Sequence, residues 1–495
     1  MKQTKLFYPC FLTTLVLASL LSACTVGPDY KLPTTTDVPD QYKEIKGWAQ
    51  AQPRDHELSG NWWELFNDPY LNFLERQVNI NNQNIIQAEA QYKQAQSLVQ
   101  NARAAYFPTI TANTSFNRFQ AASGQSVAVS GVRDLFSFVT SFAWEPDLWG
   151  RIRRQVEASQ ATAQAGAANI QAVKLLMQAT LAQNYFQLRA LDAEKKVLDE
   201  TVAAFAKTLA ITQNRYVAGV VSKADVVQAQ TQLESAKAQA INTGVQRTQL
   251  DHAIAVLAGK TPAQLSVPVS TVNAAIPDIP TVVPSQLLER RPDIAAAERM
   301  VAAANAQIGV AKAAYYPRLN LAAQNGYQAT GFDNFLNNAI QFWSLGPAAL
   351  ALPLFDGGAR GAQLDSAHQS YDASVAAYRQ TVLTGFQEVE DSLSALRILA
   401  EQMQAQDKAV QTARRAVELV NNQYLAGTVS FLNVMTAQTA ALTNARAQVT
   451  LYGQRLTATV QLIKALGGGW DTTQLPSTEE AGGKVNWSQF LPVPN

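Results

Sequence analysis

Few side chains in this sequence have the types and spacing that chemistry requires. The three histidines, His56, His252 and His368, are isolated from one another, and the sequence contains no HExxH, GxSxG or glycine-rich phosphate-binding motif. The two cysteines, Cys10 and Cys24, are too few for a cysteine metal cluster. Because paired catalytic groups are missing, we expect neither an enzyme nor a bound cofactor or metal.

Cys24 is the one residue whose surroundings predict a covalent reaction. Residues 1–23 carry two lysines and no acidic residue, and the apolar run LFYPCFLTTLVLASLLSA ends next to this cysteine. The run is too short and wrongly flanked for a stable membrane span, which predicts a cleaved signal peptide. Small residues before Cys24 resemble a bacterial lipobox, which implies acylation of the Cys24 thiol and amine. An ordinary signal peptide with an incidental first cysteine is the alternative.

The residues near this cysteine also bear on location and partners. Several acyl chains supply the multiple signals that stable anchoring in a membrane requires. Thr25 and Val26 include no aspartate of the kind that resembles an inner-membrane retention signal, which favours the outer membrane. Loss of Lys2 and Lys5 with the signal leaves 37 basic and 38 acidic residues. A net charge near −1 gives no electrostatic basis for binding nucleic acid.

Two long stretches predict very long helices. No proline lies between Pro146 and Pro262, or between Pro353 and Pro476, and glycines inside these stretches are sparse. In the first stretch, apolar residues recur at spacings of 4, 7, 7, 3, 4, 4 and 7, at Ile152, Val156, Ala163, Ile170, Val173, Met177, Leu181 and Leu188. This period is typical of coiled-coil packing, and the alanines allow close approach of helices.

The chain repeats itself. NRYVAGVVSKADVVQAQ at 214–230 returns 208 positions later as NQYLAGTVSFLNVMTAQ at 422–438, and AAYFP at 104–108 returns as AAYYP at 313–317. Gly219 and Gly427 are placed to end the two long helices, and Ser222 and Ser430 to cap the helices that return. Each repeat is therefore predicted to contain one helical hairpin.

Helix lengths indicate how the repeat packs. Residues 148–217 would form a rod of roughly 100 Å at about 1.5 Å per residue. The leading helix, 71–105, and the returning helix, 222–258, together match that length. We therefore expect one continuous helix beside two shorter helices in each repeat.

Short segments between the helices are predicted to be strands. FSFVTSFAWE at 136–145 alternates an aromatic face with a small or polar face over about the length that crosses a bilayer as a tilted strand. LNLAAQNGY at 319–327 alternates in the same way, whereas 107–118 and 340–352 are less regular, and Pro347 predicts a strand end or irregular pairing. The connections at 121–131 and 329–339 are expected to be exposed loops.

Four strands in one chain limit the possible assemblies. They cannot close a barrel, and lipid tolerates no open sheet edge. The smallest closed barrels have about eight strands. If these strands span a membrane, several chains must share one barrel.

Together these features resemble the TolC-type outer-membrane efflux proteins, in particular their lipid-anchored NodT-like branch. The resemblance rests on both hairpin phrases and on CTVGPDY (24–30), WWELFNDPYLN (62–72), RRPDIAAAERMVAAANAQIGVAKAAYYPRL (290–319) and WSLGPAALALPLFDGG (343–358). It extends from the signal to about Trp470. It implies a mostly α-helical homotrimer with a twelve-stranded outer-membrane barrel continuous with a periplasmic helical tunnel. It also implies a periplasmic adaptor and an inner-membrane pump as partners.

The resemblance assigns roles to residues by position. The hairpin tips that would contact the adaptor are Gly219, Val220, Val221, Ser222, Gly427, Thr428, Val429 and Ser430. The tunnel constriction would be formed by Asp225, Gln228, Asn433 and Thr436. The family often has acidic residues on the second returning helix, where this chain has Asn433 and Thr436. Asp225 could still form a ring of three carboxylates, so cation selectivity is not assumed. The residues expected to face lipid are Phe136, Phe138, Phe142 and Trp144.

Other conspicuous residues are expected to be structural. Trp62, Trp63 and Phe66 should pack a short segment against the bundle, and residues 290–293 suit a helix start. The acidic run at 388–391 is expected on a solvated helix face. Asp225 lies in a first helical turn, where the helix dipole stabilises it.

The sequence thus predicts six segments and two candidate functions. The segments are a signal peptide (1–23), a lipid-anchored strap (24–70), a first repeat (71–264), a linker (265–284), a second repeat (285–470) and a tail (471–495). The main hypothesis is a passive exit duct in the outer membrane. The alternative is a lipid-anchored coiled-coil tether, which predicts no barrel.

Overall fold

Two helices of 67 residues each run the length of the bundle in this computed structural model, α4 (Arg151–Val217) and α9 (Ala359–Leu425). At about 1.5 Å per residue each is roughly 100 Å long. The structure describes residues 25–34, 39, 41–44, 60–120, 132–270, 276–277 and 288–483. The signal peptide, Cys24 and the connection at 121–131 lie outside these ranges.

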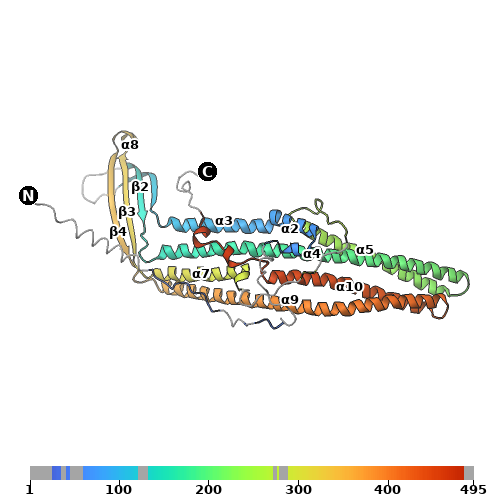
Figure 1. The fold of residues 1–495 in the computed structure, drawn as a ribbon. Helices are drawn as coiled ribbons and strands as arrows, with labels where there is room; N and C mark the ends of the chain where they lie inside the picture. Colours follow the sequence, from blue (N-terminus) through green and yellow to red (C-terminus); the bar gives the residue numbers. More distant parts are fainter. Residues whose placement is uncertain are drawn as a thin grey trace, which may run out of the picture.

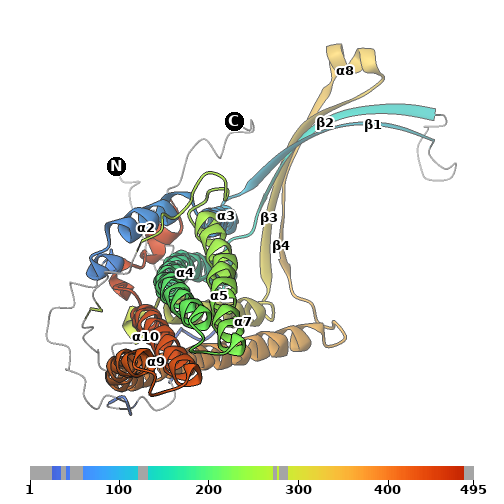
Figure 2. The same cartoon turned by 90° about the vertical axis from the view of Figure 1, so that its right-hand side faces the viewer.

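Shorter helices lie beside each long helix (Figures 1 and 2). α4 packs against α5 (Lys223–Leu257) and α3 (Gln83–Ala104), and α9 packs against α10 (Phe431–Ala465) and α7 (Pro292–Ala313). α4 also packs against α7 and α10, which joins the two repeats. The predicted arrangement of one continuous helix beside two shorter ones is confirmed.

The leading helix of the first repeat differs from the prediction. Instead of one helix over 71–105, the structure has α2 (Pro69–Asn81) and α3, separated by Asn82. Asn82 has an extended backbone (ψ 122°), and its side-chain oxygen accepts hydrogen bonds from the amides of Asn84 and Ile85. Its Nδ2 donates to the carbonyl of Leu257 at 2.8 Å, so the break also holds the end of α5.

Two glycines allow equivalent close contacts in the two repeats. Gly259 has φ +69° and Gly467 has φ +93°. A Cβ on Gly259 would overlap the carbonyl of Asn81, and a Cβ on Gly467 would overlap the carbonyl of Arg290. The end of α5 therefore packs against the residues just before α3, and the end of α10 packs against the residues just before α7.

The largest hydrophobic core lies midway along the bundle. It includes the short 3-10 helix η2 (Trp62–Phe66), whose residues Trp62, Trp63 and Phe66 are buried. The rings of Phe66 and Phe186 lie 4.8 Å apart. The expectation that this segment packs against the bundle is confirmed.

Segments at both ends of the chain bind along the helices. Arg154, in the first turn of α4, is buried and forms an ion pair with Asp29 at 2.7 Å. The amide of Val26 donates to the carbonyl of Trp149 at 3.1 Å. Near the other terminus, η3 (Thr472–Gln474) is followed by α11 (Thr478–Ala481), and Gln160 of α4 donates to the carbonyl of Thr478 at 3.0 Å.

Charged residues join the two halves of the second repeat. Arg291 is buried, donates to Glu388 at 2.7 Å and to the carbonyl of Ala465 at 3.1 Å, and precedes Pro292, the first residue of α7. The structural interpretation of 290–293 is supported. The solvated-face prediction is wrong for Glu388, which binds Arg291, and for Glu390, which accepts hydrogen bonds from backbone amides of the N-terminal segment, but it holds for the exposed Asp391.

Four antiparallel strands form one sheet in chain order. They are β1 (Thr109–Gln120), β2 (Val132–Trp144), β3 (Arg318–Thr330) and β4 (Ile340–Ala351). Phe136 lies opposite Phe116 and Ala329, and Phe142 lies opposite Ile110 and Ala323. Because directly opposed residues share a face, the aromatic face of β2 continues across its neighbours. The other face of β2 is mainly small or polar, although Leu135 and Val139 also lie on it, and the Ser115 and Ser137 hydroxyls are 2.7 Å apart there.

Two details of the sheet bear on the predictions. The pairing of β3 with β4 shifts register between Leu321 and Ala323, whose partners on β4 lie on either side of Pro347. The predicted irregular pairing is therefore confirmed. The connection at 329–339, expected to be a loop, contains the helix α8 (Phe332–Asn338). No helix in the described part of the chain is long and apolar enough to cross a membrane.

Glu75 is an unusual core residue. Its side chain is completely buried on α2, and neither carboxylate oxygen has a hydrogen-bond partner among the described residues. Burial raises the pKa of Glu75 well above its ordinary value because the charged form is poorly solvated. The folded protein therefore binds this proton more tightly than the unfolded chain.

We predict that the stability contributed by Glu75 is fully present below about pH 4.3 and is lost as pH rises towards its folded pKa. Within that window the loss is about 1.4 kcal/mol per pH unit. Glu75→Gln should remove this dependence, so its melting temperature relative to the parent protein should rise from pH 5 to pH 8. Glu89→Gln, at an exposed position of α3, is the matched control and should not change the profile. Identical pH profiles of the parent protein and Glu75→Gln would contradict the assignment.

Candidate functional site

The two helical hairpins end side by side at the end of the bundle opposite the sheet (Figure 1). In the first, Gly219 follows α4 with φ +72°, and its amide donates to the carbonyl of Tyr216 at 2.9 Å. The amide of Val220 donates to the carbonyl of Arg215 at 2.9 Å. This pair of bonds is a Schellman motif, which requires a left-handed residue at the glycine.

The second hairpin ends α9 in the same way. Gly427 has φ +76° and donates to the carbonyl of Tyr424, and Thr428 donates to the carbonyl of Gln423, both at 3.0 Å. The repeated phrase therefore encodes the same turn twice, as the sequence predicts.

The helices that leave these turns are capped differently. Ser222 and Asp225 form a capping box, in which the Ser222 hydroxyl accepts from the Asp225 amide at 3.3 Å and the Asp225 carboxylate accepts from the Ser222 amide at 3.1 Å. Ser430 occupies the equivalent position, but its side chain forms no capping bond within the described structure. The predicted side-chain cap at Ser430 is wrong; its carbonyl oxygen accepts from the Asn433 amide instead.

An aromatic cluster joins the two tips. Tyr424 and Phe431 are buried with ring centres 5.9 Å apart, and the Arg215 guanidinium lies 4.6 Å from the Tyr424 ring centre. Arg215 also donates to the carbonyl of Leu425 at 3.2 Å. Because Arg215 belongs to the first repeat and the aromatic residues to the second, this cluster fixes one hairpin against the other.

The predicted tip residues divide into two groups. Val221 and Val429 pack against the aromatic cluster. The other six are exposed at the end of the molecule: Gly219, Val220, Ser222, Gly427, Thr428 and Ser430. This second group presents most of the accessible surface of the tips in one protomer, since Val221 and Val429 are partly buried.

The residues predicted to form the constriction lie about one helical turn or more from the tips, in the direction of the sheet. Asp225 is held in the capping box, whereas Gln228, Asn433 and Thr436 are exposed. Gln228 lines a cavity of about 360 Å³ together with Met435 and Thr439. The structure thus supports the helix-start interpretation of Asp225 and leaves its gating role a prediction.

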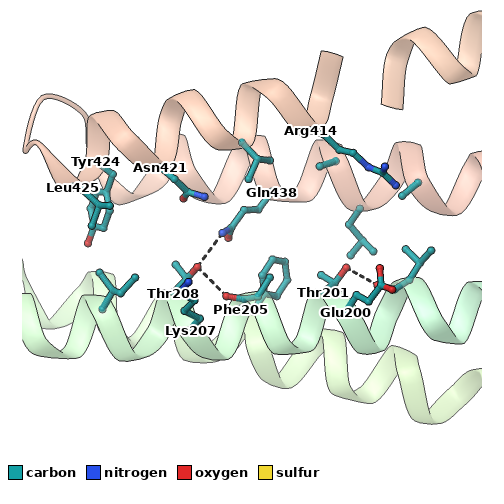
Figure 3. A pocket seen from close by; sticks show the side chains of 17 residues that line it. Glu200, Thr201, Phe205, Lys207, Thr208, Arg414, Asn421, Tyr424, Leu425 and Gln438 are labelled. Atoms are coloured by element: carbon teal, nitrogen blue, oxygen red, sulfur yellow. Dashed lines mark hydrogen bonds between the residues drawn. The ribbon is translucent and has the colours of Figure 1, made fainter. Parts of the chain in front are cut away.

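On the side of the aromatic cluster that faces the sheet, the two repeats are loosely joined. A cavity of about 400 Å³ lies between α4, α9 and α10, lined in part by Phe205 and Tyr424. Figure 3 shows Gln438 reaching across it to Thr208, with a hydrogen bond of 3.0 Å. The Arg446 guanidinium binds Glu194 at 2.5 Å further along the bundle. Polar bridges therefore connect the hairpins where apolar packing is interrupted.

Arg215, Tyr424 and Gln438 are linking residues that the sequence patterns did not predict. A signal was present, because the repeated phrase reads Asn-Arg-Tyr in the first copy and Asn-Gln-Tyr in the second. Arg215 is one of three positions, with Lys223 and Asp225, at which the two copies differ in charge, and the structure places it against Tyr424 of the second copy.

The predicted lipid-facing residues lie far from the tips, on one face of β2. The Phe136 ring is 4.7 Å from the Phe116 ring, and Phe138 and Trp144 are exposed. The Trp144 indole donates to the carbonyl of Tyr106 at 3.0 Å, at the boundary between the sheet and α3. The structure thus presents two separate surfaces, an aromatic sheet face and a pair of hairpin tips.

Comparison with known proteins relates these surfaces to a family. The sequence profile described as Outer membrane efflux protein matches residues 74–260 and 283–468, once per repeat. The probable efflux pump outer membrane protein TtgC of Pseudomonas putida is 31% identical over 466 residues, covering 93% of this chain and 95% of TtgC. Outer membrane protein OprJ of Pseudomonas aeruginosa is 29% identical, covering 94% of this chain and 97% of OprJ. The solved structure of the outer-membrane channel OprN matches with a TM-score of 0.84 at 30% identity, covering 90% of this chain and 100% of OprN.

The different caps predict different responses to the same substitution. Ser222→Ala should destabilise the start of α5 by about 1 kcal/mol, because it removes the capping hydroxyl. Ser430→Ala should have almost no effect, because that hydroxyl forms no cap. Hydrogen exchange of the first-turn amides of α5 and α10 measures both. Equal acceleration in the two variants would contradict the cap assignment.

Proposed function

The chain belongs to the outer membrane efflux protein family, and from this premise we propose that three copies form a passive exit duct that docks onto a periplasmic adaptor and an inner-membrane pump. The observation that carries the proposal is the division of the molecule into an amphipathic sheet at one end and twin hairpin tips at the other (Figure 1). The sheet suits insertion into a membrane, and the hairpin tips suit contact with a protein partner.

Strand pairing supports the trimeric barrel. β1 and β4 are the outer strands of the sheet, and in lipid their unpaired amides and carbonyls would each cost several kcal/mol. Pairing β1 of one copy with β4 of the next satisfies both edges. Three copies of four strands give a closed barrel of twelve, with the aromatic face of β2 (Phe136, Phe138, Phe142 and Trp144) towards lipid and the face that carries Ser137 and Ser141 towards the lumen.

The tips supply the proposed contact with the adaptor. Their exposed residues lie on turns held by Schellman bonds and by the Arg215–Tyr424 contact, so the surface is rigid before a partner binds. In a trimer, Asp225 would contribute three carboxylates near the tunnel mouth, accompanied by Gln228, Asn433 and Thr436. Since the second repeat adds no acid there, we infer only weak selectivity for cations.

The N-terminal contacts indicate that an acyl group on Cys24, as the sequence predicts, would lie at the membrane boundary. A Cβ on Gly150 would lie 2.7 Å from the Thr25 methyl, and Val26 is hydrogen-bonded to Trp149. Residue 25 therefore lies where β2 ends and α4 begins. An acyl group on the preceding residue would enter the periplasmic leaflet beside the barrel.

The duct performs no covalent step in this proposal, and the pump supplies the energy and selects the exported compounds. A lipid-anchored coiled-coil tether, the alternative function, needs no sheet. The aromatic face of β2, which continues with aromatic or apolar residues onto each of the other three paired strands, therefore favours the duct.

The proposal is tested by export in a strain that has the adaptor and pump but lacks its own outer membrane channel. We expect the parent chain to restore export. Gly427→Pro should form trimers but not restore export, because proline cannot adopt φ +76° or donate the bond to Tyr424. Gly244→Ala, at an open position within α5, is the control and should be active. Failure of the parent chain would refute the duct, and full activity of Gly427→Pro would refute the tip assignment.

The anchor is tested separately by Cys24→Ala. This variant should lose the acyl mass from its N-terminal peptide, yet still form heat-modifiable trimers in the outer membrane, because strand pairing closes the barrel. Cys10→Ala, within the signal peptide, should retain the acyl mass. A soluble, monomeric Cys24→Ala protein would show that the strands alone do not hold the chain in the membrane.

A further inference from the structure

The connection between β3 and β4 carries a short amphipathic helix. In α8, Phe332, Phe335 and Leu336 are spaced i, i+3 and i+4 and therefore share one face. The remaining four residues, Asp333, Asn334, Asn337 and Asn338, are polar. A helix of 7 residues is not stable by itself in water, so contacts with its surroundings must hold it.

Those contacts place α8 on the aromatic side of the sheet. The Phe332 ring lies 5.5 Å and the Phe335 ring 6.4 Å from the ring of Phe136. The amide of Gly331, just before the helix, donates to the carbonyl of Asp134 at 3.1 Å. Because the Phe136 side chain projects from the aromatic face, α8 lies over that face at the rim of the sheet, away from the helical bundle (Figure 1).

Part of the apolar face of α8 is left uncovered. Phe332 is 57% exposed and Leu336 is 67% exposed, although Phe335 is partly buried. Phe116, whose ring lies 4.7 Å from that of Phe136, and Phe138, two residues along β2, are also exposed on the same face. The same hydrophobic environment that covers the aromatic face of the sheet would therefore also cover α8.

The height of the aromatic face across the membrane indicates why the additional apolar surface of α8 is needed. Phe136 and Trp144 are eight residues apart, or about 26 Å along the strand at ~3.3 Å per residue. At a tilt of about 40° this corresponds to roughly 20 Å across the membrane, whereas the apolar band of outer-membrane barrels is about 25 Å tall. α8 adds apolar surface beyond Phe136, at the end where the sheet alone falls short.

We propose that α8 is an interfacial helix whose Phe332 and Leu336 side chains insert among the acyl chains of the outer leaflet. The inference rests on the proposed lipid-facing side of the sheet. The polar residues of α8 then face the headgroups and water. Each subunit would contribute one such helix, so the trimer would hold the outer leaflet at three points around the barrel rim.

The test measures how deeply spin labels lie in the membrane of reconstituted trimers. Single cysteines replace Leu336, Asn337 or Phe138, and each is labelled with a nitroxide. Molecular oxygen concentrates in lipid, whereas a neutral nickel chelate stays in water, so the ratio of the two collision rates reports the environment. The unsubstituted protein is the control for labelling at Cys24, the one native cysteine of the mature chain.

We expect labels at Leu336 and Phe138 to collide at least several-fold more with oxygen than with the nickel chelate, and the label at Asn337 to show the reverse. If Leu336 matches Asn337 while Phe138 remains in lipid, the inference is wrong and the lipid-facing strand stands. If Phe138 is also aqueous, the proposed orientation of the sheet fails. A Leu336 label that is shielded from both reagents would place α8 against a neighbouring subunit, which also overturns the inference.

Discussion

The need to pair every backbone amide and carbonyl within lipid governs this protein. One chain supplies four strands whose outer edges, on β1 and β4, have no neighbour in the described protomer. Water could satisfy those groups in the periplasm, but hydrocarbon cannot. The long helices follow from the same requirement, since a chain that shares a barrel must also share the wall of the tunnel below it. α4 and α9 are equal in length because each is one of the full-length helices that form that wall.

The repeat gives the two halves similar shapes but different chemistry. The Schellman turns at Gly219 and Gly427 are nearly identical in geometry, as are the helix-end contacts at Gly259 and Gly467. The joints between stacked helices differ, because Asn82 makes neutral hydrogen bonds in the first repeat and Arg291 makes ion pairs in the second. Backbone geometry is thus shared between the halves, while side-chain interactions have diverged.

The sequence predicts those parts of the fold that depend on period and on backbone conformation. Helix length, glycine turns and the alternation of β2 are local properties, and the structure agrees with them. Asn82 was not predicted as a break, because an asparagine within an apolar period is compatible with a continuous helix. Glu388 and Glu390 were assigned to solvent because their partners, Arg291 and the N-terminal segment, are distant in sequence. The role of Arg215 required knowing that the two hairpins lie side by side. Glu75 occupies a core position of the pattern Leu71, Leu74, Val78, so periodicity alone could have shown that it is buried.

The hydrogen bond between Val26 and Trp149 has a mechanical consequence for the proposed lipid anchor. Only Thr25 separates the bonded residue from Cys24, and an extended residue spans at most about 3.6 Å. Acyl chains on the proposed Cys24 anchor would therefore be attached with almost no slack to the turn that precedes α4. A vertical displacement of the barrel would then pull on those chains directly, so bilayer thickness would set the height at which the hairpin tips meet the proposed adaptor.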